Sequence, residues 1–139
     1  MTAINLWRSK NRLEPFGASI VVLNEKNEIL LLKRVGTCNW MPDKWGLPGG
    51  LIEANETHHA AALRETFEET ELKVDPASLV LLSIDKKVAI YFSMVYTGVV
   101  KIDEEHSDWA WVNREKVTTY DTVPRIAELF DRALNYGKN

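Results

Sequence analysis

The apolar positions of this chain follow two periods, that of a strand and that of a helix. Five runs of alternating or continuous apolar residues predict β-strands, because polar or turn-forming segments bound each of them. These runs cover residues 16–23, 28–34, 78–84, 88–99 and 107–112. Leu30, Leu31 and Leu32 in succession indicate a strand that is covered on both faces. The two runs beside residues 85–87 are expected to pair as an antiparallel hairpin.

Two further segments have helical spacing. In the C-terminal one, the apolar positions are Ile126, Leu129, Phe130, Ala133 and Leu134. Pro124 is expected in its first turn and Gly137 just past its end, because proline is tolerated where a helix begins and glycine is common where one stops. Two helices flanking a mixed sheet predict a fold of the α/β class.

The other helical segment begins after Thr57, a residue type that caps helices well. One side, expected to pack on the core, carries Ala60, Leu63, Thr66 and Phe67. The nearly opposite side carries Glu65, Glu68 and Glu69. Carboxylates spaced i, i+3 and i+4 repel one another, so stability alone does not explain them. A divalent cation such as Mg²⁺, which binds carboxylate oxygens, is their natural complement.

Arg64 lies between these two sides of the helix. Its side chain is placed to reach back to Glu56 at the helix entrance. A charge-assisted bond between them would fix the loop that precedes the helix.

Residues 50–72 resemble the Nudix motif, G-x5-E-x7-R-E-U-x-E-E-x-G-U, in which U is a bulky apolar residue. The matching positions are Gly50, Glu56, Arg64, Glu65, Glu68, Glu69 and Leu72. The Leu-Pro-Gly-Gly sequence at residues 47–50 is a familiar companion of that motif. The resemblance to small, MutT-like Nudix hydrolases implies an α/β/α sandwich with a mixed β-sheet between helices.

Two positions depart from the motif. Thr66 replaces an apolar residue, and its methyl group can still pack. Glu71 replaces the glycine that normally ends the helix in a left-handed conformation, which costs a residue with a Cβ about 1 kcal/mol or more. We expect the helix to run slightly further instead, up to the stop at Val74, Asp75 and Pro76.

The resemblance also implies metal-dependent hydrolysis of a nucleoside diphosphate linked to another group. One or more Mg²⁺ or Mn²⁺ ions would grip the pyrophosphate and lower the pKa of the attacking water. The main ligands would be Glu68 and Glu69, with support from Glu65 and from the backbone carbonyl of Gly49. In many relatives a glutamate of a later acidic loop also reaches the metal, and Glu105 is the best-placed candidate here.

The catalytic residues are expected among Arg64 and the glutamates named above. The carboxylate that takes the proton from water is left open between Glu65 and Glu105. The alternative for Glu105 is an ordinary solvated charge in the acidic loop 103–106.

Substrate contacts are less specific. Lys33, Arg34 and Lys44 are candidates to bind phosphates, and a solvated strand edge or loop is the alternative. Trp45 is a candidate to stack on a base, although core packing is the more common explanation for any single tryptophan. His58 and His59 are expected to be surface residues without a function.

Composition and charge bear on the number of domains, on nucleic-acid binding and on the compartment. The 139 residues, 45% hydrophobic and 27% charged, suit a single domain over 1–139. The net charge of −3 includes a local −5 at residues 53–71, and no basic face for duplex nucleic acid is evident. A lone cysteine, Cys38, and the absence of a signal-peptide pattern in Met1–Arg12 or of a membrane-spanning run predict a cytoplasmic protein.

The sequence therefore favours a (d)NTP pyrophosphohydrolase that releases a nucleoside monophosphate and pyrophosphate. Hydrolysis of ADP-ribose, a nucleotide sugar or a dinucleoside polyphosphate is the alternative within the family. A nucleotide-sensing module without turnover is a further alternative, which the complete set of motif glutamates disfavours. A homodimer is neither required nor excluded.

Overall fold

The structure is a computed structural model that describes residues 15–85 and 87–138. The expectations for Met1–Arg12 lie outside these residues.

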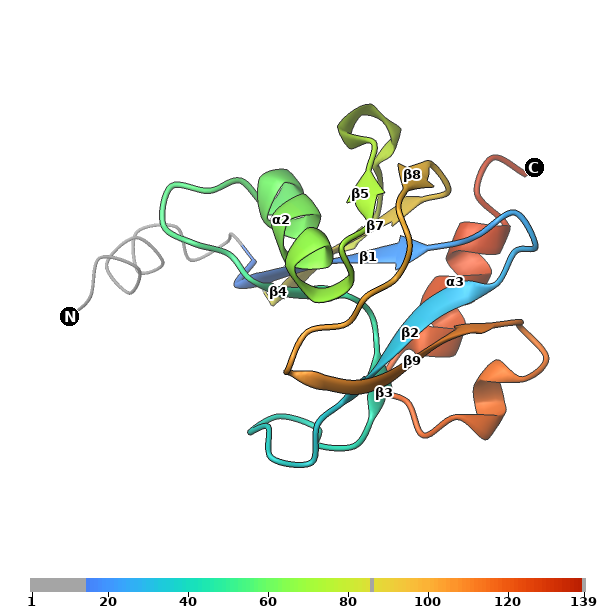
Figure 1. The fold of residues 1–139 in the computed structure, drawn as a ribbon. Coiled ribbons are helices and arrows are strands. Elements are labelled where there is room, and N and C mark those ends of the chain that lie inside the picture. Colours follow the sequence, from blue (N-terminus) through green and yellow to red (C-terminus); the bar gives the residue numbers. More distant parts are fainter. Residues whose placement is uncertain (1–14, 86, 139) are drawn as a thin grey trace.

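A mixed sheet of four strands runs in the order β4-β1-β7-β6 (Figure 1). Its strands are β1 (Gly17–Val22), β4 (Gly49–Leu51), β6 (Val80–Ile84) and β7 (Val88–Ser93). β1 and β7 are parallel, whereas β4 pairs with β1 and β6 with β7 in antiparallel orientation. The antiparallel pair predicted beside residues 85–87 is thereby confirmed.

Two smaller antiparallel sheets accompany it. One has the order β3-β2-β9, and the other joins β5 to β8. Their strands are β2 (Ile29–Arg34), β3 (Trp45–Gly46), β9 (His106–Val112), β5 (Lys73–Val74) and β8 (Tyr96–Thr97). The ladder between β2 and β9 ends with Arg34 opposite His106, which brings the end of β2 to the acidic loop 103–106.

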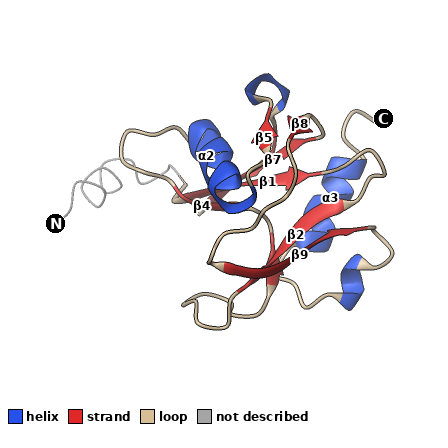
Figure 2. Ribbon diagram, in the orientation of Figure 1, coloured by secondary structure: helices blue, strands red, loops and turns tan. Residues whose placement is uncertain are grey.

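Helices α2 (His58–Thr70) and α3 (Ile126–Leu134) lie on opposite sides of the strands, as Figures 1 and 2 show. Two 3₁₀ helices, at Pro76–Ser78 and Val117–Thr119, are short connectors. None of the helices in the described part of the chain is long and apolar enough to cross a membrane. The α/β class, with a mixed sheet between two helices, is confirmed.

Alternation along β2 builds a core on each of its faces. Leu31 packs in the cluster that includes Phe130 of α3, whereas Leu30 and Leu32 pack in the cluster that includes Ala61 of α2. All three leucines are 0% exposed. The prediction of a strand covered on both faces is confirmed, and β2 is packed between the two helices.

Several predicted element bounds were wrong. The strand predicted over 78–84 begins at Val80, after the 3₁₀ helix that ends at Ser78. The strand predicted over 88–99 ends at Ser93, because the Ser93 hydroxyl accepts a 2.9 Å bond from Val95 N–H and turns the chain toward β8. The C-terminal helix begins at Ile126, so Pro124 lies before it rather than in its first turn. Arg125, in a left-handed conformation with φ 73°, separates them.

Helix α2 starts as predicted, since the Thr57 hydroxyl accepts a 3.0 Å bond from Ala60 N–H. Its packing side differs from the prediction. The buried residues are Ala61, Ala62, Thr66, Glu69 and Thr70. Of the predicted core side, Thr66 is buried and Leu63 packs against the core while partly buried, whereas Phe67 is 43% exposed and Ala60 is also exposed. Small side chains let the helix lie close to β1 and β4, and Glu69 is turned inward rather than outward.

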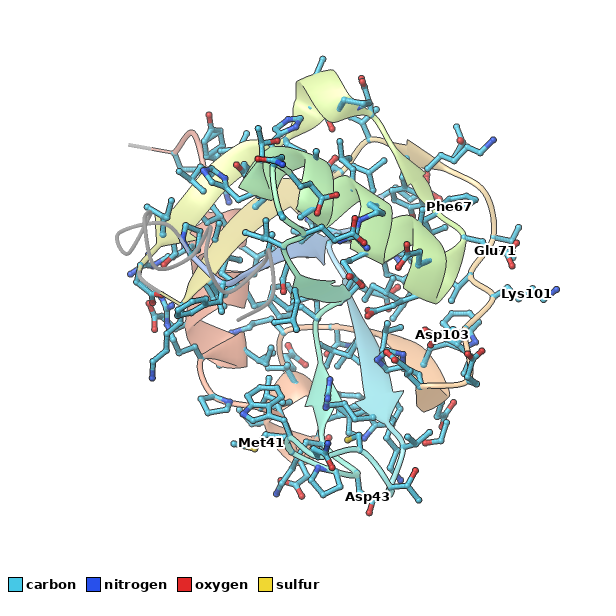
Figure 3. All side chains as sticks on the ribbon, turned by 90° about the vertical axis from the view of Figure 1, so that its left-hand side faces the viewer. Met41, Asp43, Phe67, Glu71, Lys101 and Asp103 are labelled. Atoms are coloured by element: carbon cyan, nitrogen blue, oxygen red, sulfur yellow. The ribbon has the colours of Figure 1, made fainter. Side chains whose placement is uncertain are left out.

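The end of α2 corrects the expectation for Glu71. The helix stops at Thr70, and Glu71 adopts the left-handed conformation with φ 61° and ψ 10°. Its N–H still donates to the carbonyl of Phe67 at 2.8 Å, which closes the last turn. Glu71 projects outward beside Phe67 and Lys101 in Figure 3. This glutamate therefore takes the backbone conformation of the motif glycine, despite its cost.

Candidate metal centre and substrate cleft

Glu69 is the most deeply placed carboxylate of the motif. Its residue is 5% exposed, and its Oε1 accepts a 3.0 Å hydrogen bond from the backbone N–H of Gly49. Burial raises the pKa of Glu69 to about 8, while the Gly49 bond opposes part of that rise. The neighbouring charges of Glu65, Asp103 and Glu105 raise it further. Such a carboxyl ionises most readily when a cation is bound beside it.

Three carboxylates from two distant segments come together here. One oxygen each from Glu69, Asp103 and Glu105 lies within 4.8 Å of the others. Asp103 comes from the segment between β8 and β9, and Figure 3 shows it next to the C-terminal half of α2. Oxygen donors this close suit a hard divalent ion such as Mg²⁺, so the donor set fits the predicted metal.

Asp103 was not among the candidates drawn from the sequence. It belongs to the same acidic loop as Glu105, but spacing alone does not tell which acids of a loop face inward. The path of the segment decides this, because Lys101 N–H donates to Thr70 O at 2.9 Å and ties it to the end of α2. Nδ1 of buried His106 lies 2.7 Å from Oδ1 of Asp103 and orients that carboxylate.

Arg64 holds the loop before α2, as predicted. Its Nε donates to Glu56 at 2.8 Å and its Nη2 donates to the other oxygen of Glu56 at 3.0 Å. Nη2 also donates to the carbonyl of Leu51 at 3.0 Å, and Nη1 to Glu65 at 3.0 Å. The Arg64 guanidinium lowers the pKa of Glu56. One cation therefore joins the loop, β4 and the acidic side of the helix.

Glu65 lies against the backbone of β4. A Cβ placed on Gly50 would come within 2.5 Å of the Glu65 carboxyl carbon and would displace this carboxylate from its position against β4. Burial raises the pKa of Glu65, and the hydrogen bond from Arg64 opposes that rise. The motif glycine at position 50 is thus explained by the carboxylate packed on it.

Glu68 lies at the rim. Its side chain is 53% exposed, and its oxygens accept bonds of 3.2 and 3.3 Å from Arg64 Nη1. It is not one of the three grouped carboxylates, although the sequence placed it among the main ligands. Gly49 enters the site through its N–H, and a ligand role for its carbonyl stays a prediction.

A cleft of about 870 Å³ opens next to the grouped carboxylates. Glu105 belongs both to that group and to the lining of the cleft. Arg34 and Trp40 also line it, together with apolar residues that include Phe16 and Leu51. The cleft is large enough for a nucleotide, since small-molecule sites span about 300–1,000 Å³.

Only Arg34 of the predicted substrate contacts lines this cleft. Lys33, Lys44 and Trp45 are not among the described residues that form it. Lys44 makes a 2.7 Å ion pair with Asp121. The Trp45 ring packs edge-on against Tyr120 at 5.0 Å, beside the core of α3. Arg34 is accordingly the strongest of these four candidates.

The two histidines at the start of α2 have structural contacts. Nδ1 of His58 hydrogen-bonds to the hydroxyl of buried Tyr91, and Nε2 of His59 lies 3.1 Å from the carbonyl of Pro76. His59 also packs edge-on against the Tyr91 ring at 5.6 Å. Both histidines are therefore part of the packing between α2 and β7.

Comparison with known proteins places the chain in a family. Residues 14–133 match the model of the NUDIX domain. The chain is also similar to the MutT protein from Methanosarcina mazei Go1, at 30% sequence identity. The two structures superpose with a TM-score of 0.70 over 91% of this chain and 98% of that one. The α/β/α arrangement implied by residues 50–72 is confirmed.

Curated relatives carry several activities. A 54-residue segment is 44% identical to a Bacillus subtilis (strain 168) protein provisionally named an 8-oxo-dGTP diphosphatase, over 39% of this chain. The chain spans about a third or less of the length of the first such relatives. Dihydroneopterin triphosphate diphosphatase from Haemophilus influenzae is 24% identical over 96% of this chain and 94% of its own. By the match over residues 14–133, this chain belongs to the Nudix hydrolase family.

Proposed function

We propose that this protein is a divalent-metal-dependent pyrophosphohydrolase that cleaves a (d)NTP into a nucleoside monophosphate and pyrophosphate. One observation carries the proposal: Glu105 lines a nucleotide-sized cleft and also belongs to the group of carboxylates around buried Glu69. A metal held by that group would lie at the end of the cleft, where a phosphate chain can reach it. Relatives named as diphosphatases of triphosphate compounds support this substrate class.

The metal-holding residues would be Glu69, Asp103 and Glu105, with Glu65 and Glu68 as further candidates at the rim. Mg²⁺ or Mn²⁺ bound there would neutralise phosphate charge and acidify the attacking water. Glu69 would give up its proton to hold such a cation, since its raised pKa reflects burial without a counter-ion. Arg64 keeps the loop at Glu56 and the Glu65 carboxylate in place.

Water attacks the α- or the β-phosphorus, and the bond from that phosphorus to the oxygen that bridges the two breaks, so that nucleoside monophosphate and pyrophosphate separate. The water proton passes to a carboxylate, for which we favour Glu65. Burial makes the Glu65 carboxyl more basic than a free one, so it accepts a proton better near neutral pH. Glu105 is the alternative acceptor.

The test is release of pyrophosphate and nucleoside monophosphate from a panel of nucleotides, with Mg²⁺ and with EDTA. The panel spans ordinary and oxidised dNTPs, NTPs, ADP-ribose, nucleotide sugars and dinucleoside polyphosphates. Glu65→Gln should lower kcat by about 10²–10⁴-fold if it removes the proton acceptor. A loss of less than about twofold in Glu105→Gln would remove Glu105 from the catalytic residues.

Exposed Glu115, which is neither in the grouped carboxylates nor in the cleft lining, supplies the matched control. Glu115→Gln should behave as the native chain, whereas Glu69→Gln should lose both turnover and Mn²⁺ binding measured by calorimetry. No turnover on any nucleotide, with nucleotide binding retained, would replace this proposal with the sensing module.

A further inference from the structure

We propose that Arg34 and Trp40 form a flat platform on which the nucleobase of the substrate stacks, and that this platform sets affinity for the nucleoside part. The inference rests on the proposed function, because it assigns the part of the nucleotide that lies beyond the phosphates. Both side chains line the cleft that Glu105 also lines.

Trp40 is unusually open for an aromatic residue inside a cleft. It is 55% exposed, on the segment that joins β2 to β3. Phe16 and Leu51, which line the same cleft, are 42% and 65% exposed. Scattered apolar residues on a surface are ordinary, but several around one cleft indicate a bound apolar group. An aromatic base is the apolar part of a nucleotide.

The guanidinium of Arg34 lies over the Trp40 ring, with Cζ 5.1 Å from the ring centroid. Its Nε donates a 2.7 Å bond to the carbonyl of Trp40, and the Cys38 thiol donates to the same carbonyl at 3.2 Å. These contacts hold the guanidinium and the indole ring together, so little side-chain freedom is lost when a base stacks on them.

The backbone holds this platform in register with the acidic loop. Arg34 N–H donates to Lys44 O at 2.9 Å, and Asp43 N–H donates to Arg34 O at 3.1 Å, which closes the segment on itself. Met41 and Asp43 mark this segment in Figure 3, with α2 above it. Val35 N–H donates to the carbonyl of Glu105 at 3.0 Å. Val35 directly follows Arg34 in the chain, so this hydrogen bond fixes the base platform relative to Glu105 of the candidate metal centre.

The guanidinium of Arg34 keeps hydrogen-bond donors available in the cleft. Among the described residues, its Nη atoms have no hydrogen-bond partner, and they lie in the plane of the guanidinium. They can donate to a phosphate or to a base edge, while the outer faces of the guanidinium and of the Trp40 ring remain for stacking. Base–aromatic stacking tolerates any base, so the platform gives affinity for a nucleoside more than a choice of base.

The experiment compares Trp40→Ala and Trp40→Phe with Trp109→Ala. Trp109 is an exposed tryptophan, at 36%, outside the cleft lining. Trp40→Ala should raise KM for the best nucleotide about 5- to 150-fold, the factor that corresponds to stacking energies of about 1–3 kcal/mol. Trp40→Phe should keep KM within about threefold of native, since it keeps an aromatic face. Trp109→Ala should be unchanged.

Ribose 5-triphosphate, which has no base, separates stacking from phosphate binding. Its KM should be the same in the native chain and in Trp40→Ala. An equal rise for both substrates, or no rise for the nucleotide, overturns the platform and leaves the proposed hydrolase standing.

If the native chain hydrolyses no nucleotide, equilibrium binding of dGMP and AMP by calorimetry takes the place of KM. Weaker binding by Trp40→Ala than by Trp109→Ala then supports the platform although the proposed hydrolase has failed. Equal binding by the two variants overturns it.

Discussion

The backbone N–H of Gly49 donates a 3.0 Å hydrogen bond to the carboxylate of Glu69, across 20 residues of chain. Gly49 has φ 155°, and a Cβ there would lie 2.1 Å from the hydroxyl oxygen of Ser19. Only glycine can therefore bring its N–H to this point beside β1. The start of β4 and the helix that carries the candidate metal ligands are joined at one buried carboxyl.

The protonation of Glu69 should make stability depend on pH. Its pKa is about 8 in the fold against an ordinary 4.5. Between these values the folded chain holds a proton that the unfolded chain has lost. In EDTA, the free energy of unfolding should consequently fall as pH rises through this range, by at most about 1.4 kcal/mol per pH unit. Glu69→Gln should flatten the fall and be more stable than the native chain at pH 8.

Urea denaturation at several pH values between 5 and 9 measures this slope. Glu68→Gln is the matched control, because Glu68 is an exposed glutamate of the same helix. Equal slopes in the two variants would mean that Glu69 is not the group that titrates.

Replacement of Arg64 tests the hydrogen bonds that its planar guanidinium donates at the start of α2. Arg64→Lys keeps the charge but cannot reach Glu56, Glu65 and the carbonyl of Leu51 together. We expect the free energy of unfolding to drop by about 1–3 kcal/mol, measured by urea denaturation in EDTA.

Arg114→Lys is the control for a surface pair, since Arg114 also makes a two-bond contact, with partly exposed Asp131. That change should cost at most about 1 kcal/mol. A larger loss for Arg114 than for Arg64 would contradict the role assigned to Arg64.

Restoring the motif glycine should stabilise the protein. Glu71 is held at φ 61°, where glycine avoids the cost of a Cβ. Glu71→Gly should raise the free energy of unfolding by about 1 kcal/mol. Glu71→Ala keeps the Cβ and should gain much less. If both variants gain equally in denaturant titrations, the glutamate side chain rather than the backbone is the source of the cost.

His106 should act as a positioning residue for Asp103. His106→Leu removes the group 2.7 Å from the Asp103 carboxylate and should weaken Mn²⁺ binding about 10- to 100-fold. His106→Asn supplies a donor near the position of Nδ1 and should restore much of the affinity. Calorimetric titration with Mn²⁺ distinguishes this from a packing defect, which both variants would share.

The sequence predicted the strands around residues 16–34 and the antiparallel pair beside residues 85–87, because these depend on local alternation and turns. It also predicted the contact from Arg64 to Glu56, since a helix start and a fixed spacing suffice to place them. It failed at Phe67, which is exposed, because a helical stripe does not tell how closely a helix can approach its sheet. Alanines at positions 61 and 62 allow the closer approach.

The chain by itself determined its family, its two helices and the acidic motif on α2, all of which are matters of residue type and spacing. The tertiary structure decided which acids meet. Asp103 joins Glu69 only because the segment after β8 is tied to the end of α2. It likewise decided that Arg34 and Trp40 share a cleft with Glu105, whereas Lys44 pairs with Asp121. Contacts between distant segments follow from packing and chain path, which local patterns do not contain.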